Sequence, residues 1–214
     1  MSANETHSLS PRAAVPIHWM DIQFAVVLGI VVTAMKLIAH AKPEWRLNGA
    51  DALVAFLLTV GYMIARARRQ PELLDEWGIT TPLTWPAVAA AFVLLLIGIA
   101  GEAATGMAVA GKLPFEPFYI PNMLAYTTGA FPQEFAMCSI GLVTLAKLPV
   151  FRGAWRLPLT VGAVFCLAHF WTPAHIPGTP IPIQMVVTFP AGFFFTLYFL
   201  HFRTILPLTV IHCI

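Results

Sequence analysis

Residues 85–107, WPAVAAAFVLLLIGIAGEAATGM, decide the fold class of this protein, because the stretch contains a single ionisable side chain, Glu102. A helix of about 20 apolar residues is long enough to span a hydrocarbon core of roughly 30 Å. Backbone polar groups in lipid have to pair within their own segment, which makes such a span helical. The stretch therefore predicts a transmembrane helix.

Similar apolar runs recur along the chain, separated by short polar or proline-rich loops. None of them alternates between apolar and polar residues, as the strands of a membrane β-barrel do. We therefore predict an all-α, polytopic membrane helix bundle with about seven transmembrane segments, the last of which is too short to span alone. The predicted segments are residues 21–40, 50–65, 85–107, 121–146, 157–171, 183–202 and 204–214.

The composition excludes an ordinary soluble domain. Hydrophobic residues make up 58% of the chain and charged residues only 10%, whereas about 25% of the residues in a soluble domain are charged. Residues 1–20 are polar and lack the basic-then-apolar order of a signal peptide. We therefore expect a polar cytoplasmic segment over residues 1–20, followed by a membrane domain over residues 21–214.

Lysine and arginine residues are distributed unevenly between the two sides of this topology. Cytoplasmic loops of membrane proteins are enriched in these residues. The richer side holds the N-terminus and the loops after the second, fourth and sixth segments, so we predict a cytoplasmic N-terminus, in a bacterial cytoplasmic membrane. That side carries Arg12, Arg66, Arg68, Arg69, Lys147, Arg152, Arg156 and Arg203, and the opposite side carries Lys42, Arg46 and Lys112.

Ionisable residues inside transmembrane helices are costly and are candidates for function. Glu134 lies near the middle of the fourth segment, His169 near the outer end of the fifth, and His212 roughly 12 Å along the seventh at 1.5 Å per residue. In the predicted topology these three side chains can meet in the outer half of the membrane. His201 is expected at the inner interface, and Glu102 either joins the site or faces the lipid headgroups.

A buried carboxylate beside two imidazoles has two interpretations. The carboxylate can act as a general base on a water molecule, while a histidine donates to the oxyanion that forms. Alternatively, the same groups only tie helices together through hydrogen bonds, each worth about 0.6 kcal/mol in a membrane. Spacing alone leaves both interpretations open.

The sequence predicts neither a metal site nor a cofactor. Cys138, Cys166 and Cys213 lie in apolar runs without CxxC spacing, which favours a role as small buried hydrophobes. The chain also contains no HExxH motif. The expected partners are the lipid bilayer and a peptide or protein substrate at the membrane, with no nucleic acid. The oligomeric state stays open.

Three stretches of the sequence carry a resemblance to a known family. FCLAH, residues 165–169, matches an FxxxH motif, and FPQEFAMCS, residues 131–139, lies where that family has EExxxR. YFLHFRTILPLTVIH, residues 198–212, is similar to the segment that ends in the family's third histidine. Over residues 75–214 the chain thus resembles the CAAX protease and bacteriocin-processing family, also called the Abi family, of glutamic intramembrane endopeptidases.

The resemblance implies a multi-helix membrane protease and assigns roles to particular residues. Carried over from the family, Glu134 and His169 activate and position the water molecule, and His212 stabilises the developing charge. Gln133, at the first position of the glutamate pair, is the fourth residue of the predicted catalytic set, beside Glu134, His169 and His212. Cys138 occupies the arginine position. An amide cannot act as a general base, so Glu134 takes that role, and Cys138 brings no guanidinium to the carboxylate.

These two departures keep a second function open, that of a catalytically inactive or altered member acting as an immunity, binding or scaffold protein. A small-solute transporter is a third class, but it would show paired charges and internal repeats, which this sequence lacks. A site in the outer half favours a secreted or anchored bacterial peptide as substrate over a prenylated cytoplasmic protein.

Overall fold

The computed structural model describes most of the chain, and every element of regular structure among the described residues is helical. This confirms the predicted all-α fold class. Of the predicted polar segment, residues 1–20, only residues 18–20 are described. The described residues are 18–42, 49–114, 119–151, 153, 155–168 and 179–212, without the side chains of residues 39, 40 and 119–125.

Four helices are long and apolar enough to cross a membrane, and each begins and ends close to a predicted segment. This supports a multi-pass membrane protein, while the predicted count of about seven spans is not confirmed. α7 (Arg156–Ala168) is also apolar but shorter than these four. The four are α1 (Trp19–Ala41), α2 (Ala50–Ala67), α4 (Trp85–Ala110) and α8 (Ile181–Phe202).

The fourth predicted segment is a continuous helical run made of three pieces. α5 (Tyr119–Glu134) passes into the π-helix η2 (Phe135–Leu142) and then into α6 (Val143–Ala146). Pro132 lies inside α5, and a proline removes one donor from the helical hydrogen-bond ladder. Short π-helical turns within α-helices are frequent at functional sites. The junction of α5 and η2 is such an irregularity, in the middle of the bundle.

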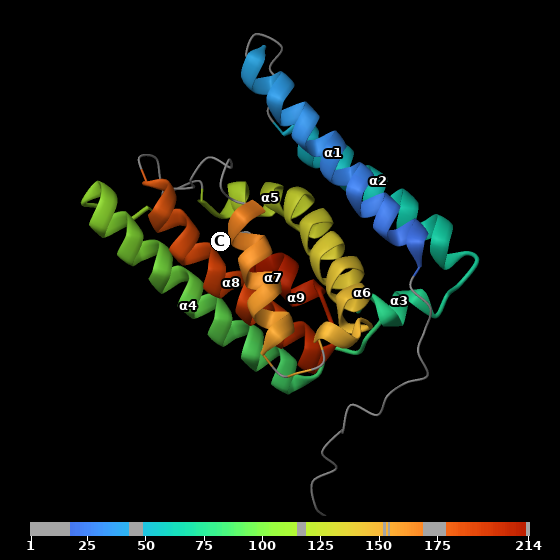
Figure 1. Ribbon diagram of the computed structural model, residues 1–214. Coiled ribbons are helices and arrows are strands. Elements are labelled where there is room, and N and C mark those ends of the chain that lie inside the picture. Colours follow the sequence, from blue (N-terminus) through green and yellow to red (C-terminus); the bar gives the residue numbers. More distant parts are fainter. Residues whose placement is uncertain are drawn as a thin grey trace, which may run out of the picture.

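The predicted short last segment folds back into the bundle. After α8, Arg203 adopts the left-handed region with φ of 57°, and the chain turns into α9 (Leu206–Ile211). α9 contacts α5 and α4, and it lies behind α7 near the centre of Figure 1. Leu208 and Ile211 are buried, so this helix is part of the core although it is too short to span.

α1 and α2 form a pair at one side of the bundle, as Figure 1 shows, with α2 against α5 and α1 against η2. α7 and α8 pack against each other more closely than this pair does. A Cβ atom built on Gly192 of α8 would lie only 2.6 Å from Cβ of Phe165 in α7. Small residues at such contacts let membrane helices approach closely, so Gly192 sets the spacing of α7 and α8.

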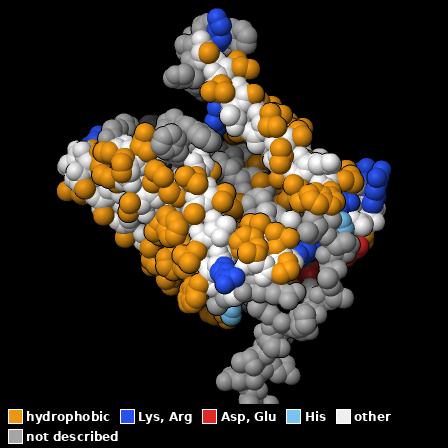
Figure 2. All heavy atoms as spheres, viewed as in Figure 1, with side chains coloured by type: hydrophobic (Ala, Val, Ile, Leu, Met, Phe, Trp, Pro, Cys, Tyr) orange, Lys and Arg blue, Asp and Glu red, His pale blue; other side chains and the backbone are white. Residues whose placement is uncertain are grey.

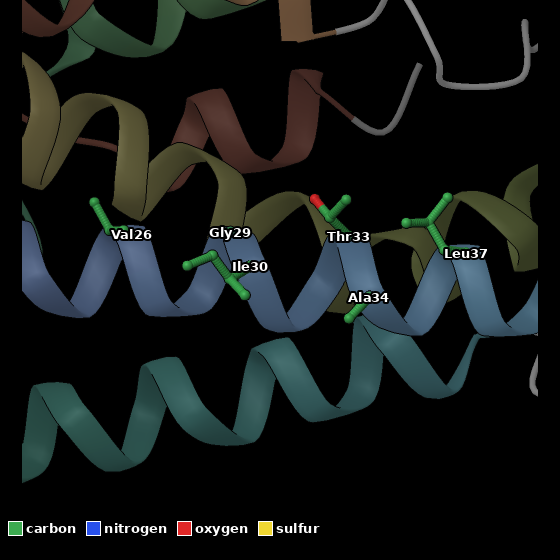
Figure 3. Close-up of a pocket in the computed structure, with 6 residues that line it drawn as sticks. All are labelled: Val26, Gly29, Ile30, Thr33, Ala34 and Leu37. Atoms are coloured by element: carbon green, nitrogen blue, oxygen red, sulfur yellow. The ribbon is translucent and has the colours of Figure 1, made fainter.

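The outer surface of the bundle is largely apolar. Figure 2 shows hydrophobic side chains over most of the visible helices, with Lys and Arg in a few small groups. Trp85 and Val186 are 80% and 71% exposed, which suits contact with lipid. A shallow open groove follows α1 (Figure 3), and one helix supplies its whole lining. The lining residues are Val26, Gly29, Ile30, Thr33, Ala34 and Leu37.

Three basic side chains gather where α3 (Leu73–Glu76) and the loop after it meet the ends of other helices. Lys147, which follows α6, pairs with Glu76 at 2.8 Å. Arg203, which follows α8, donates from Nη2 to the carbonyl oxygen of Glu76 at 3.1 Å. Arg66, near the end of α2, pairs with Asp21 at the start of α1. We call this part of the molecule the basic end; its placement on the cytoplasmic side stays a prediction.

Candidate functional site

Glu134 is a buried acid in the middle of the helical run from α5 to α6. It is the last residue of α5, and its side chain has no exposed surface. The preceding residue, Gln133, is exposed. Successive residues of a helix are rotated by about 100°, so the two side chains face different surroundings. The carboxylate at the second motif position is therefore the one inside the bundle.

His212 approaches Glu134 from the end of α9. Its Nδ1 lies 2.5 Å from Oε1 of the carboxylate, and 11% of the His212 side chain is exposed. The contact is an ion pair when the imidazole is protonated and a hydrogen bond when it is neutral. The structure thus brings together two of the four residues predicted as catalytic, from segments far apart in the sequence. Their catalytic role stays a prediction.

The thiol of Cys138 contacts the other oxygen of the same carboxylate. Its Sγ lies 3.4 Å from Oε2 of Glu134, a geometry in which the thiol donates and the carboxylate accepts. The two residues are four positions apart, a spacing that brings helical side chains together. Each oxygen of Glu134 therefore has its own partner.

Aromatic rings from α7 and α8 pack against His212. The ring centroid of Phe165 lies 5.4 Å from that of the imidazole, in an edge-to-face arrangement, and the ring centroid of Phe195 lies 6.1 Å away. The place of Phe165 depends on the close approach of α7 and α8 at Gly192. Apolar surroundings strengthen electrostatic interactions, so these rings reinforce the contact between His212 and Glu134.

Three other sequence candidates are not among the described contacts of Glu134 and His212. His169 lies outside the described residues, so its predicted meeting with Glu134 stays a prediction. Glu102 lies in α4 and is partly buried, and its part in the site stays open. His201 is exposed near the end of α8, where its ring contacts Phe202 at 4.5 Å.

The candidate site lies closer to the basic end than to the opposite end. Phe135, directly after the buried acid, packs its ring 5.1 Å from the ring of Trp77 in the loop after α3. α9 starts at the same loop, because the backbone N–H of Ile205 donates to the carbonyl of Gly78 at 3.2 Å. The seven residues that follow Ile205, up to His212, rise roughly 10 Å along the helix, a small part of a membrane about 30 Å thick.

The expected location of the pair in the outer half of the membrane stays a prediction. The expectation counted His212 from residue 204, whereas the turn at Arg203 delays the start of α9 to Leu206. α9 therefore carries His212 only a short way from the basic end.

Sequence reasoning found Glu134 and His212 but missed two of their neighbours. Phe195 gave no signal, because it is one of many phenylalanines in an apolar helix. Cys138 was recognised only as a departure from a motif, not as a hydrogen-bond donor. In the described part of the chain, no group of three or more His, Cys, Asp or Glu side chains is placed to hold a metal ion.

No family model, curated protein or solved structure matches the chain.

Proposed function

We propose that this chain is an intramembrane endopeptidase of the CAAX protease and bacteriocin-processing type, which hydrolyses a peptide bond with water activated by Glu134. The observation that carries the proposal is a carboxylate with no exposed surface, contacted at 2.5 Å by an imidazole from another helix of an apolar bundle. Acids at membrane depth are costly and are generally kept for function. The sequence resemblance supplies the reaction class.

In the proposed reaction Glu134 is the general base. Its carboxylate removes a proton from water, and the resulting hydroxide oxygen forms a bond to the scissile carbonyl carbon. The carbonyl electron pair moves onto its oxygen to give a tetrahedral intermediate. When that pair returns, the C–N bond breaks and the proton held by Glu134 passes to the amine leaving group. Water is the only co-reactant.

The two histidines have different parts in this proposal. His212 contacts Glu134 directly, and its positive charge, when protonated, stabilises the oxyanion at close range. His169 follows Phe165 by four residues, a spacing that returns to the same face of a helix, and the ring of Phe165 contacts His212. We therefore retain His169 as the second residue that positions the water. Gln133, which is exposed, has no step in this reaction.

The depth of the site bears on the substrate. With a cytoplasmic N-terminus the basic end faces the cytoplasm, and the Glu134–His212 pair lies in the cytoplasmic half of the membrane. We therefore propose a membrane-anchored peptide whose scissile bond lies in that half, in place of the secreted peptide suggested by an outer site. Labelling of an Arg68→Cys variant tests the orientation: a membrane-impermeant reagent should modify it only in opened vesicles.

A non-catalytic binding or scaffold protein is the second candidate. The observation that favours it is that both oxygens of Glu134 already contact side chains of the chain itself. A carboxylate held in this way can serve as a cross-link between α5 and the end of α9. A binding or scaffold protein of this kind should lose stability when the negative charge of Glu134 is removed, with no peptide cleavage to be affected.

Peptide cleavage by the purified full-length chain in proteoliposomes distinguishes the two candidates. A synthetic peptide library with acylated anchors serves as the probe, and mass spectrometry detects the products. We compare the wild type with Glu134→Gln, which keeps the shape of the side chain and removes the base. Glu76→Gln is the matched control, because that carboxylate pairs with Lys147 and not with His212.

The endopeptidase proposal expects Glu134→Gln to lower the cleavage rate by roughly 10²–10⁴-fold, the usual contribution of a general base. Glu76→Gln should keep the wild-type rate per folded molecule. Wild-type cleavage that survives Glu134→Gln overturns the assigned mechanism. No cleavage by the wild type across the library favours the binding protein.

A further inference from the structure

We propose that Cys138 is a positioning residue for Glu134, holding the carboxylate through Oε2 while Oε1 contacts His212. The inference rests on the proposed function and deepens it, because it assigns a role to the position where the resembling family has arginine. Its basis is the distance of 3.4 Å between Sγ of Cys138 and Oε2 of Glu134, with both side chains fully buried.

A second contact is needed because a single one leaves the carboxylate free to turn. The terminal torsion of a glutamate side chain is broad and roughly two-fold, so one hydrogen bond fixes one oxygen but not the plane of the group. His212 contacts only Oε1. The thiol contacts the other oxygen from the same helix as Glu134, so the two contacts together set the direction from which a proton can be taken.

The backbone that carries Cys138 is itself held in place. Ser139, the next residue, donates from Oγ to the carbonyl oxygen of Trp77 at 2.6 Å. Trp77 is 1% exposed and packs against Phe135, three residues before Cys138. η2 is therefore anchored to the loop after α3 on both sides of Cys138, and the thiol has a fixed place relative to Glu134.

The choice of a thiol has a chemical consequence. Ionised donors form strong hydrogen bonds to carboxylates and favour the charged form, which lowers the tendency of the carboxylate to accept a proton. A thiol is a weak, neutral donor. Cys138 can therefore orient Glu134 without adding a positive charge beside the carboxylate, as the arginine of the resembling family would.

Raman spectroscopy of the S–H stretch tests the contact without reference to activity. The band of Cys138 is identified as the one missing from the Cys138→Ser spectrum of the full-length protein. The S–H stretching band of a hydrogen-bonded thiol lies at lower frequency than that of a thiol without a partner. We therefore expect the Cys138 band at the low-frequency end of the S–H range. Glu134→Ala should move this band upward. A band that does not respond to Glu134→Ala overturns the proposal.

Cleavage kinetics then test the positioning role. Cys138→Ser keeps a donor and should retain most of the wild-type kcat, whereas Cys138→Ala should lower kcat roughly 10-fold at unchanged KM, as for a lost hydrogen bond to a charged group. Cys166→Ala, on α7, is the matched control and should match the wild type. If packing alone mattered, Cys138→Ala would be the better variant, because a serine hydroxyl is costlier to bury than a methyl group.

The outcomes separate this inference from the proposed function. Equal rates for Cys138→Ser and Cys138→Ala beside an active wild type remove the positioning role and leave the endopeptidase proposal intact. A wild type that cleaves nothing removes both.

Discussion

Two buried carboxylates join helices in this protein, and they differ in their partners. Asp21 accepts hydrogen bonds from the hydroxyl of Tyr62 at 2.5 Å and from Nε of Arg66 at 3.1 Å, which join α1 to α2 at the basic end. Glu134 contacts the imidazole of His212 at 2.5 Å and a thiol, and lies deeper, with no exposed surface.

The partners decide what each carboxylate is able to do. Arginine is always protonated, so the Asp21–Arg66 contact is a permanent ion pair that serves as a clamp between two helices. Histidine gains and loses a proton near neutral pH, and a thiol is a weak donor. A buried acid whose partner can gain and lose a proton is therefore a better candidate for chemistry than one held by a permanent cation.

Replacing the acid of the clamp should have the largest effect on stability. Asp21→Ala leaves the buried guanidinium of Arg66 without its carboxylate, and removing one partner of a buried pair costs about 3–5 kcal/mol. Unfolding of the purified protein by SDS titration measures the loss. Glu72→Ala, at an exposed position, is the control. An Asp21→Ala protein that is as stable as the control would contradict the clamp.

Removing His212, the partner of Glu134 that can gain and lose a proton, should act mainly on the rate of peptide cleavage. We expect His212→Ala to lower peptide cleavage about 100-fold, at the low end for groups that take part in proton transfer, because Glu134 loses the contact that orients it. His201→Ala is the matched control at an exposed histidine and should cleave within two-fold of the wild type. Equal losses in both variants would mean a general effect of histidine removal.

Widening the gap between α7 and α8 should disturb the Glu134 region but not the clamp. In Gly192→Ala the new methyl group meets Phe165 at 2.6 Å, and overpacking of this kind costs about 1–3 kcal/mol. The displaced ring also loses its place beside His212, so cleavage should fall together with stability. Gly29→Ala is the control, since a Cβ there meets nothing within 4 Å. A Gly192→Ala protein matching that control would contradict the role of the close contact.

The smallest expected effect concerns the second donor of the clamp. Tyr62→Phe removes the hydroxyl from Asp21 but keeps the ring, which stacks on Phe24 with centroids 3.9 Å apart. One hydrogen bond inside a membrane protein is worth about 0.6 kcal/mol on average, so the ion pair to Arg66 should keep most of the stability. SDS titration should show a shift much smaller than that of Asp21→Ala; a loss of equal size would place the hydroxyl, not the charge, at the centre of the clamp.

The positions of the helices could be read from the sequence because the membrane imposes a local rule. The predicted segment 85–107 corresponds to α4, which spans Trp85–Ala110, and the predicted segment 183–202 corresponds to α8, which spans Ile181–Phe202. Apolar length alone predicts such spans. The short helix α3 was missed because a single turn of four residues carries no periodic pattern.

The candidate site could be predicted only in part. Glu134 and His212 stood out because ionisable residues are rare in apolar runs, but the difference between exposed Gln133 and buried Glu134 depends on how the helix is rotated. The contact of Cys138 with Glu134 also requires that η2 face the bundle interior. These features depend on contacts between helices, which no local pattern reports.

The amino-acid sequence by itself determined that this is a helical membrane protein, where its main helices lie, and which few polar groups they carry inward. Only the tertiary structure decided that Glu134 meets His212 and which donors share the carboxylate. The physical reason is that insertion into lipid depends on the hydrophobicity of each segment, whereas a shared carboxylate depends on the rotation and close approach of several helices.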